Sequence, residues 1–243
     1  MKAVIINQYG SVKELQLTDL PVPAIEGNEV LVKNHYTTVN PWDNRVRNGS
    51  MRMITGKKFP KILGIESAGI IEKVGNEISK FNVGDRVMVS TGINTGSYAE
   101  YVKVPATSLA LLPDSVSFKE GSSLPIVGTT AYNALHKLGA IKNGDHVLIN
   151  GASGGVGIMA MQLAKLAGAR VTAICSTSSI DAVVQLNPDQ IIDYKKQEVY
   201  GIQRQYDIIF DTVSVLSFRK MKNLLNPGGV MINTLPTPKA MIT

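Results

Sequence analysis

One stretch of this chain, residues 144–165, constrains the fold more than any other. It reads GDHVLINGASGGVGIMAMQLAK: an apolar strand predicted over His146–Asn150 enters a glycine-rich turn, and a helix predicted over about Val156–Leu166 leaves it. The first N–H groups of a helix have no acceptor within the helix and lie at the positive end of its dipole. A pyrophosphate can accept those N–H groups when glycines let the backbone come close. The stretch therefore predicts a strand–turn–helix site for a phosphorylated cofactor.

The spacing of the glycines in this turn is typical of dinucleotide binding. Gly154 and Gly157 match the second and third glycines of the G-x-G-x-x-G pattern, and Ala152 replaces the first. Such glycines also occur in ordinary turns, but the strand before them and the amphipathic helix after them favour a cofactor site. The residues expected to contact the cofactor here are Ala152, Ser153, Gly154, Gly155, Val156 and Gly157.

A longer pattern over the same stretch resembles a known family. The residues that carry it are Gly144, Asp145, Leu148, Ala152, Ser153, Gly154, Gly155, Gly157, Gln162 and Lys165. They fall at the spacing of the quinone oxidoreductase/ζ-crystallin signature, within the medium-chain dehydrogenase/reductase superfamily. The resemblance implies a Rossmann fold, a doubly wound parallel sheet, for this part of the chain.

The first half of the chain is β-rich and resembles the catalytic domain of zinc-free members of that superfamily. Strands are predicted at Lys2–Asn7, Glu29–Thr38, Ser67–Val74, Arg86–Ser90 and Ala99–Pro105. The resemblance rests on Asn40-Pro41-x-Asp43, Arg47-x-Gly49, Gly64-Ile65-Glu66-x-Ala68-Gly69, Val74-Gly75, residues 81–87 and Gly96-Ser97-Tyr98-Ala99-Glu100-Tyr101. It implies a GroES-like β-barrel.

From Gly144 onward, short apolar strands alternate with helices, which indicates a parallel sheet covered on both faces. The predicted strands are His146–Asn150, Arg170–Cys175, Gln190–Asp193, Asp207–Asp211 and Val230–Thr234, with a helix at Ser214–Leu225 before the last. Another helix is predicted to start near Ser117, which forms a capping box with Glu120, and to bend or break at Pro125. We therefore expect an α/β protein with a GroES-like domain over residues 1–120 and an NADP-binding Rossmann domain over residues 121–243.

Members of this family continue past the fifth strand of the nucleotide sheet, whereas this chain stops at Thr243. We therefore expect that the C-terminal part of the family fold is missing. The chain is then either a fragment or a shortened relative. The sixth strand commonly forms the dimer contact in this family. A homodimer is therefore expected only if the full-length protein supplies that strand.

Composition argues against several classes of protein. The net charge is +6, but lysines and arginines are dispersed, so a mildly basic surface is favoured over nucleic-acid binding. No apolar run is long enough to span a bilayer, and the N-terminus does not resemble a signal peptide, so a cytoplasmic protein without membrane partners is expected. The one cysteine, Cys175, allows no disulfide within the chain and is expected to pack in a strand.

The same resemblance implies a metal-free enzyme. Zinc-dependent relatives hold catalytic zinc with a cysteine and a histidine, and the matching positions here are Asn40 and Ile65. Isoleucine has no lone pair to donate, and an amide oxygen is a poor zinc ligand beside thiolate or imidazole. The four cysteines of a structural-zinc lobe are also absent. No metal ligand is therefore predicted.

The cofactor is expected to be NADP(H). An enzyme that uses NAD normally has an acidic residue about twenty positions past the last glycine, but that position falls on Ser176, followed by Thr177. These hydroxyls can donate to a 2′-phosphate, and this segment has no carboxylate to repel one. Tyr194, in the family's Ile-Asp-Tyr element, and the nearby Lys195 could add a contact. The alternative is that the serine segment is only a polar loop and helix cap.

Two further segments resemble the family's contacts to the nicotinamide end. Thr130 stands in a G-x-T element near the expected nicotinamide ribose. Asp211 and Val213 follow the fourth strand of the predicted sheet, at the carboxyl edge where open α/β sheets bind ligands. Asp211 could equally be a helix-capping or turn residue.

The resemblance implies hydride transfer from NADPH to a quinone or to an α,β-unsaturated carbonyl. Such acceptors are already electron-poor, so the protein needs only to orient them and to stabilise negative charge on oxygen. The candidate catalytic residues are Asn40, as a hydrogen-bond donor, and Arg45, as an electrostatic stabiliser, although a surface salt bridge is the simpler role for Arg45. Trp42 is expected to pack in the barrel rather than line the site.

Other functions remain open at this stage. One is an enoyl or alkenal reductase, or a zinc-free enzyme resembling an alcohol dehydrogenase. Another, from a different class, is a catalytically silent nucleotide-binding protein that acts as a redox sensor or binds RNA. Oxidation of NADPH by a panel of quinones and enals separates the enzymes from the silent protein.

Overall fold

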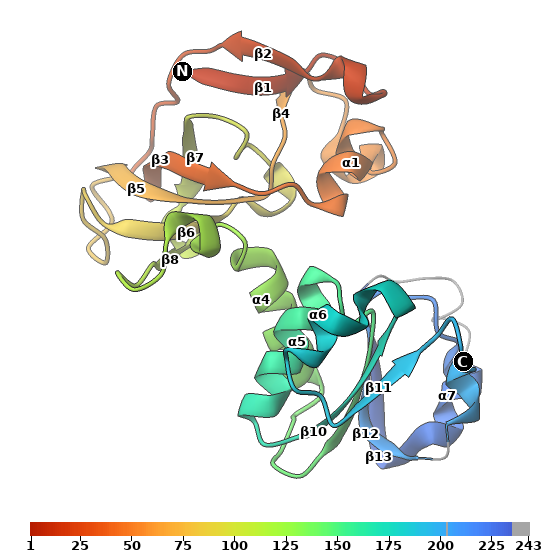
Figure 1. Ribbon diagram of the computed structural model, residues 1–243. Coiled ribbons are helices and arrows are strands. Elements are labelled where there is room, and N and C mark those ends of the chain that lie inside the picture. Colours follow the sequence, from red (N-terminus) through yellow and green to blue (C-terminus); the bar gives the residue numbers. More distant parts are fainter. Residues whose placement is uncertain (203, 235–243) are drawn as a thin grey trace. The chain divides into compact units, whose positions relative to one another are not determined.

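The computed structural model of the protein describes residues 1–202 and 204–234. Contacts between Cα atoms divide the chain into two compact units, Met1–Ile126 and Val127–Thr243. The first consists mainly of antiparallel strands, and the second of parallel strands that alternate with helices (Figure 1).

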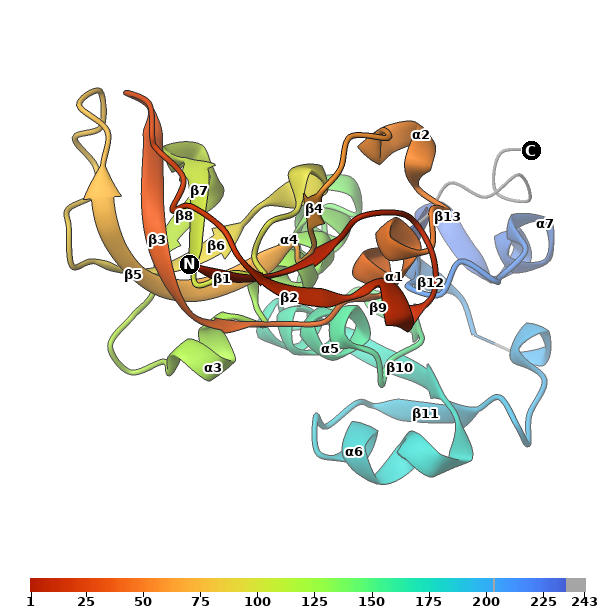
Figure 2. The ribbon, with the colours of Figure 1, turned by 90° about the horizontal axis from the view of Figure 1, so that it is seen from above.

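Two antiparallel sheets form the first unit. The larger sheet curls and has the strand order β7-β3-β5-β6-β8, and the smaller has the order β2-β1-β4 (Figure 2). The strands are β1 (Lys2–Ile6), β2 (Gln16–Asp19), β3 (Glu29–Thr37), β4 (Lys61–Ile62), β5 (Glu66–Val74), β6 (Arg86–Ser90), β7 (Tyr101–Pro105) and β8 (Leu109–Leu111), and the helices are α1 (Pro41–Arg47), α2 (Arg52–Thr55) and α3 (Phe118–Gly121). A GroES-like β-barrel was expected, and this curled sheet confirms the GroES-like class in the form of a half-barrel.

Alternate residues of the larger sheet face one core. Val30 and Val32 on β3 and Val87 and Val89 on β6 are completely buried and belong to one apolar cluster. Residues two apart on a strand point to the same face, so the valines gather on one side. Burying each of them contributes about 1.5–3 kcal/mol to folding.

The second unit contains a parallel sheet with the order β11-β10-β9-β12-β13 in the described part of the chain. Its elements are α4 (Pro125–Tyr132, which begins in the first unit), a π-helical turn (Asn133–Leu138), β9 (His146–Asn150), α5 (Gly155–Leu166), β10 (Arg170–Cys175), α6 (Ile180–Val184), β11 (Gln190–Asp193), β12 (Tyr206–Asp211), α7 (Phe218–Met221) and β13 (Leu225–Asn233). The order 3-2-1-4-5 along the sheet is that of a Rossmann fold and confirms the predicted class.

Helices cover both faces of this sheet. Val147 and Ile149 of β9 point to one face, in a cluster with Met161 of α5. Leu148 points to the other face, in a cluster with Met221 of α7. Figure 1 shows α5 and α7 on opposite sides of the strands. The continuous apolar run of β9 is explained by this two-sided burial.

The predicted long strands are confirmed, and β6, β9, β10 and β11 have the predicted bounds. Three short strands were not predicted: β2, β4 and β8. Each lies at an edge of its sheet. An edge strand that buries little needs no apolar alternation, so its sequence carries no strand pattern.

The helix predicted to start near Ser117 is also confirmed. α3 follows Ser117, whose hydroxyl accepts the N–H of Glu120, while the Glu120 carboxylate accepts the N–H of Ser117. The helix ends before Pro125, where α4 begins, as the proline predicted.

The helix predicted over Ser214–Leu225 is wrong in its first part, because α7 covers only Phe218–Met221. The Asp211 carboxylate accepts the backbone N–H of Ser214 at 2.9 Å and that of Leu216 at 2.7 Å. Ser214 has a φ of +59°, in the left-handed region. These bonds hold a turn where the apolar pattern predicted a helix.

Candidate active site

The turn between β9 and α5 leaves the N-terminus of α5 without a side-chain cap. Gly154 is the N-cap residue, has an extended backbone (φ −79°, ψ 162°) and offers no side chain to cap the helix. The first-turn residues Gly155, Val156 and Gly157 therefore present N–H groups with no acceptor inside the helix. Gly154 and Gly155 are exposed. An anion such as a pyrophosphate can approach these N–H groups directly.

Two glycines of this turn differ in what surrounds them. A Cβ added to Gly157 would lie 2.2 Å from the carbonyl oxygen of Gly151 and 2.7 Å from Cα of Ala152. Gly157 therefore lets α5 pack closely on the end of β9. A Cβ added to Gly154 would meet only the oxygen of Gly151, at 3.4 Å. The outer side of Gly154 is open, which is what close approach of a cofactor needs.

Ala152 supports the turn from inside. It is completely buried, and its N–H donates to the carbonyl of Ile174 at 3.0 Å. The N–H of Gly154 donates to Gly151 at 3.0 Å. Ser153 lies between them and is half-buried. The N–H groups left for a phosphate are therefore mainly those of the first turn of α5.

The end of β12 packs against the same turn. A Cβ on Gly151 would lie 2.5 Å from Oγ1 of Thr212 and 2.5 Å from Cγ2 of Val213, so the predicted contact Val213 lies beside the turn. Asp211 is completely buried, and its Oδ1 accepts the amide N–H of Asn150 at 2.8 Å. Together with its bonds to the following backbone, this makes Asp211 a turn-forming residue.

Thr130 lies half-buried on α4. The same helix approaches the glycine-rich turn through Val127, whose Cγ1 would lie 3.0 Å from a Cβ on Gly155. Thr130 is thus one turn of helix away from a residue that packs on the cofactor turn.

The serine segment after β10 forms a cluster of hydroxyl groups. Oγ of Ser176 lies 3.0 Å from Oγ of Ser178 and 3.1 Å from Oγ of Ser179. Thr177 points elsewhere, because its hydroxyl donates to Asp193 at 2.6 Å. Tyr194 is half exposed. The segment therefore holds three converging hydroxyls, those of Ser176, Ser178 and Ser179, whereas the Thr177 hydroxyl donates to Asp193 instead.

Asp193 is a residue that the sequence analysis missed as a neighbour of this segment. Cys175 at the end of β10 pairs with Asp193 at the end of β11, which brings the carboxylate to Thr177. The hydrogen bond from Thr177 is the main reason why the pKa of Asp193 is lowered. The backbone N–H of Lys195 also donates to it, at 2.9 Å. The segment itself contains no carboxylate, but the structure places the carboxylate of Asp193 next to it.

In the first unit, Asn40 belongs to a partly buried hydrogen-bond network. Its amide nitrogen donates to Oγ1 of Thr38 at 3.0 Å and to Oε1 of Glu66 at 2.9 Å. The Thr38 hydroxyl also donates to Oε1 of Glu66, at 2.5 Å. Glu66 is only 1% exposed. No role was assigned to Glu66 from the sequence; the available signal was a charged residue directly before the small and apolar residues 67–71 of β5.

Asp43 forms a second part of the same region. Its carboxylate accepts the backbone N–H groups of Asn40 at 2.7 Å and Gly64 at 3.1 Å, and the hydroxyl of Tyr98 at 3.1 Å. Burial raises the pKa of Asp43, and burial together with the nearby Asp43 charge raises the pKa of Tyr98. Asp43 therefore fixes the start of α1, on which Arg45 lies.

Arg45 and Trp42 lie on this short helix. Arg45 is half-buried and has no carboxylate within salt-bridge distance among residues 1–202 and 204–234. The expected surface salt bridge is thus not found there, and the charge of Arg45 is not offset by one. Trp42 packs against the cluster of Ile6, Val46 and Leu63, as predicted.

The residues at the two zinc-ligand positions do not fit a metal ion. Ile65 is an apolar side chain, 5% exposed, and the amide nitrogen of Asn40 is bonded to Thr38 and Glu66. In the part of the chain that the structure describes, no cluster of three or more His, Cys, Asp or Glu side chains could hold a metal.

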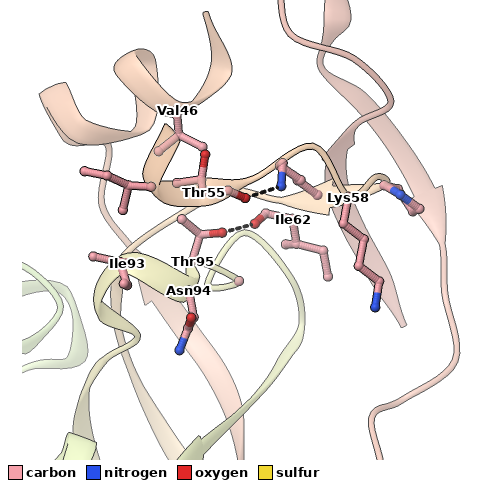
Figure 3. Close-up of a pocket in the computed structure, with 11 residues that line it drawn as sticks. Val46, Thr55, Lys58, Ile62, Ile93, Asn94 and Thr95 are labelled. Carbon is pink, nitrogen blue, oxygen red and sulfur yellow. Dashed lines mark hydrogen bonds between the residues drawn. The ribbon is translucent and has the colours of Figure 1, made fainter. Parts of the chain in front are cut away.

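A pocket of about 450 Å³ lies in the first unit, and Asn40, Thr38 and Glu66 do not line it (Figure 3). The Nζ of Lys61 donates to the carbonyl of Thr55 at 2.7 Å, and the hydroxyl of Thr95 donates to Ile62 at 2.6 Å. These polar groups hold the pocket walls together. The residues that line it are Val46, Ile54, Thr55, Lys58, Pro60, Lys61, Ile62, Ile93, Asn94, Thr95 and Gly96. It contains no predicted site residue.

Both units match known protein families. Residues 26–114 match the family described as alcohol dehydrogenase GroES-like domain. Residues 155–234 match the family described as zinc-binding dehydrogenase. Within the described residues, no helix has both the length and the apolar character needed to cross a membrane.

Individual relatives are quinone oxidoreductases. The chain is 35% identical to the chloroplastic quinone-oxidoreductase QR1 of Triphysaria versicolor, over 100% of this chain and 77% of the relative. It is 33% identical to the quinone oxidoreductase of Homo sapiens, over 96% and 72% of the two chains. It resembles the crystal structure of Escherichia coli quinone oxidoreductase complexed with NADPH, with a TM-score of 0.85 and 26% identity over 96% of this chain and 72% of that one.

Proposed function

This chain belongs to the quinone oxidoreductase family of the medium-chain dehydrogenases/reductases, and we propose that it reduces a quinone or an α,β-unsaturated carbonyl with NADPH and without zinc. The observation that carries the proposal is the bare N-terminus of α5 behind the open, exposed Gly154. Without a side-chain cap, the N–H groups of the first helical turn are free to bind an anionic ligand in place of water.

The second unit would hold the cofactor. Gly155, Val156 and Gly157 would donate their N–H groups to the pyrophosphate, and Val213 would lie beside the cofactor at the end of β12. Thr130 on α4 is proposed to contact the nicotinamide ribose. When bound, NADPH supplies the hydride; the protein supplies orientation and electrostatics.

A preference for NADPH is supported by the hydroxyl cluster. Ser176, with Ser178 and Ser179, offers hydroxyl donors where a 2′-phosphate would lie, and Tyr194 and Lys195 are the nearest aromatic and cationic residues after β11. The Asp193 carboxylate opposes this preference, but its oxygens already accept hydrogen bonds from Thr177 and Lys195. Thr177 would therefore act through Asp193 rather than on the phosphate.

In the first unit, Asn40 is proposed to stabilise the oxygen of the acceptor as it gains negative charge. One of its amide hydrogens is bonded to the Thr38 hydroxyl, a neutral acceptor, at 3.0 Å. An oxyanion that replaces Thr38 would form a charge-assisted bond about twice as strong. Replacing the Thr38 hydroxyl by the oxyanion as hydrogen-bond acceptor therefore stabilises the transition state more than the resting protein. Arg45, whose charge no salt bridge offsets in the described chain, would add electrostatic stabilisation.

Separate fluorescence titrations with NADPH and NADH test the cofactor, and a panel of quinones and enals then tests turnover at 340 nm. We expect tight NADPH binding followed by oxidation. Binding without oxidation by any acceptor would support the silent nucleotide-binding alternative instead. The absence of binding would mean that the turn at Gly154 is not a working site.

The cytoplasm remains a prediction for the compartment, although the Triphysaria relative is named as chloroplastic. Cell fractionation with an antibody to this chain would decide it: recovery in an organelle fraction would contradict the prediction.

A further inference from the structure

The carboxylate of Glu66 is buried and fully engaged. It lies at the start of β5 and is 1% exposed. Its Oε1 accepts the Thr38 hydroxyl and the Asn40 amide, and its Oε2 accepts the backbone N–H of Ile126 at 2.8 Å. A buried carboxylate is tolerated only where hydrogen bonds replace its lost hydration. This one has three donors, two of which are side chains of the proposed active site.

The bond from Ile126 fixes the rotation of the carboxylate. Because Oε2 is held by a backbone N–H, Oε1 has to face Asn40 and Thr38. Backbone donors move less than side chains, so the direction of Oε1 is set by the fold. The acceptor that Asn40 meets therefore has a defined position.

That acceptor determines which end of the Asn40 amide faces it. The nitrogen and oxygen of a side-chain amide have almost the same shape, so packing alone does not distinguish two orientations that differ by a half-turn. An ionised carboxylate only accepts hydrogen bonds, so the nitrogen has to point toward Glu66. The second amide hydrogen then points to Thr38.

We propose that Glu66 is a positioning residue: it accepts one N–H of the Asn40 amide and thereby keeps the second N–H, bonded to Thr38 in the resting protein, available to the reacting oxygen. The inference deepens the proposed function and rests on the role given there to Asn40. Without the Glu66 acceptor the amide can turn by half a rotation and present its carbonyl oxygen, which repels an oxyanion. Glu66 itself touches no reacting atom and acts through Asn40.

The test uses Glu66→Gln, which keeps the shape but replaces one acceptor oxygen by a donor. Glu72→Gln is the matched control, because Glu72 is exposed on the same strand. The first readout is the side-chain amide signal of Asn40 in ¹⁵N-labelled protein, assigned by its loss in Asn40→Ala. We expect Glu66→Gln to move this signal and Glu72→Gln to leave it in place. An unmoved signal in folded Glu66→Gln would overturn the proposal.

The second readout separates positioning from general structure. We expect Asn40→Ala to lower kcat for 1,4-benzoquinone about 100-fold, and Glu66→Gln to lower it about tenfold, both with unchanged NADPH affinity. In the Asn40→Ala background, Glu66→Gln should change kcat by less than about twofold, because both changes act through one group. Multiplicative effects, or no effect of Asn40→Ala beside a loss in Glu66→Gln, would contradict action through Asn40.

Two outcomes need separate treatment. If wild-type protein turns over no acceptor, the proposed function fails, and the Asn40 amide signal still decides whether Glu66 orients that side chain. If Glu66→Gln does not fold, hydrogen exchange in the wild type decides. The side-chain amide hydrogens of Asn40 should then exchange with solvent more slowly than those of the exposed Asn48. Equal rates would refute the proposal.

Discussion

The hydroxyl of Thr177 donates to Oδ2 of Asp193 at 2.6 Å and joins the ends of two neighbouring parallel strands. The bond places a carboxylate of low pKa beside the segment proposed to bind the 2′-phosphate. It also removes Thr177 from the set of free hydroxyl donors. Cofactor preference therefore depends on how well the partners of Asp193 hold its charge.

This bond predicts a pH-dependent contribution to stability. Because the folded pKa of Asp193 lies below its ordinary value of 3.8, the contribution is present above that value and is lost as pH falls through the folded pKa. Thr177→Val removes the largest cause of the shift. Urea denaturation should show a wild-type advantage at neutral pH that disappears in acid. A difference that stays constant into acid would show that the bond does not set this pKa.

The cofactor preference predicts the effect of a charge at Ser176. A carboxylate there repels a 2′-phosphate but can accept the 2′-hydroxyl of NADH. Ser176→Asp should therefore lower the ratio of NADPH to NADH affinity about tenfold, or ~1.4 kcal/mol. Fluorescence titration measures both affinities. Ser115→Asp, an exposed position in the first unit, is the control for added charge alone, and an unchanged ratio in Ser176→Asp would argue against the assignment.

Much of the second unit could be predicted because its signals are local. The strand, the turn and the first turn of α5 follow one another in the chain, so the spacing of Gly154 and Gly157 was enough to predict their surroundings. The contact between Thr177 and Asp193 could not be predicted in this way. It depends on the register between β10 and β11, which tertiary packing determines.

The two glycines of the cofactor turn predict opposite behaviour on substitution. Gly157→Val forces a side chain against the backbone of Gly151 and should destabilise the protein by about 1–3 kcal/mol. Gly154→Ala meets no close neighbour and should leave the free energy of unfolding within ~0.5 kcal/mol, yet weaken NADPH binding by blocking its approach. Denaturation and titration of both variants check this. Wild-type NADPH affinity in Gly154→Ala would argue against cofactor binding at the turn between β9 and α5.

The Arg45 charge predicts a loss of turnover without a loss of cofactor binding. If its guanidinium stabilises developing charge on the acceptor, Arg45→Gln should lower kcat about tenfold and leave the NADPH dissociation constant unchanged. Arg52→Gln, on the exposed face of α2, removes the same charge nearby and serves as the control. Equal effects of the two variants would show that Arg45 contributes no more to turnover than a surface charge does.

The candidate site in the first unit was predicted only in part. Asn40 was proposed from its position in a family motif, and the structure places it in a network with Thr38 and Glu66. The loop before α1 and the strand β5 are 26 residues apart at this contact. No local pattern connects residues across that distance. A turn was one of the roles left open for Asp211, but the helix predicted from Ser214 was wrong, because hydrogen bonds to the Asp211 side chain overrode a local helical pattern.

The most direct test of hydride transfer is a single turnover. Protein preloaded with a slight deficit of NADPH is mixed with 1,4-benzoquinone, and absorbance at 340 nm is followed in wild type and Asn40→Ala. We expect a first-order decay that saturates with quinone, is faster than that of free NADPH and slows in the variant. A decay at the rate of free NADPH, unchanged by the variant, would contradict this expectation.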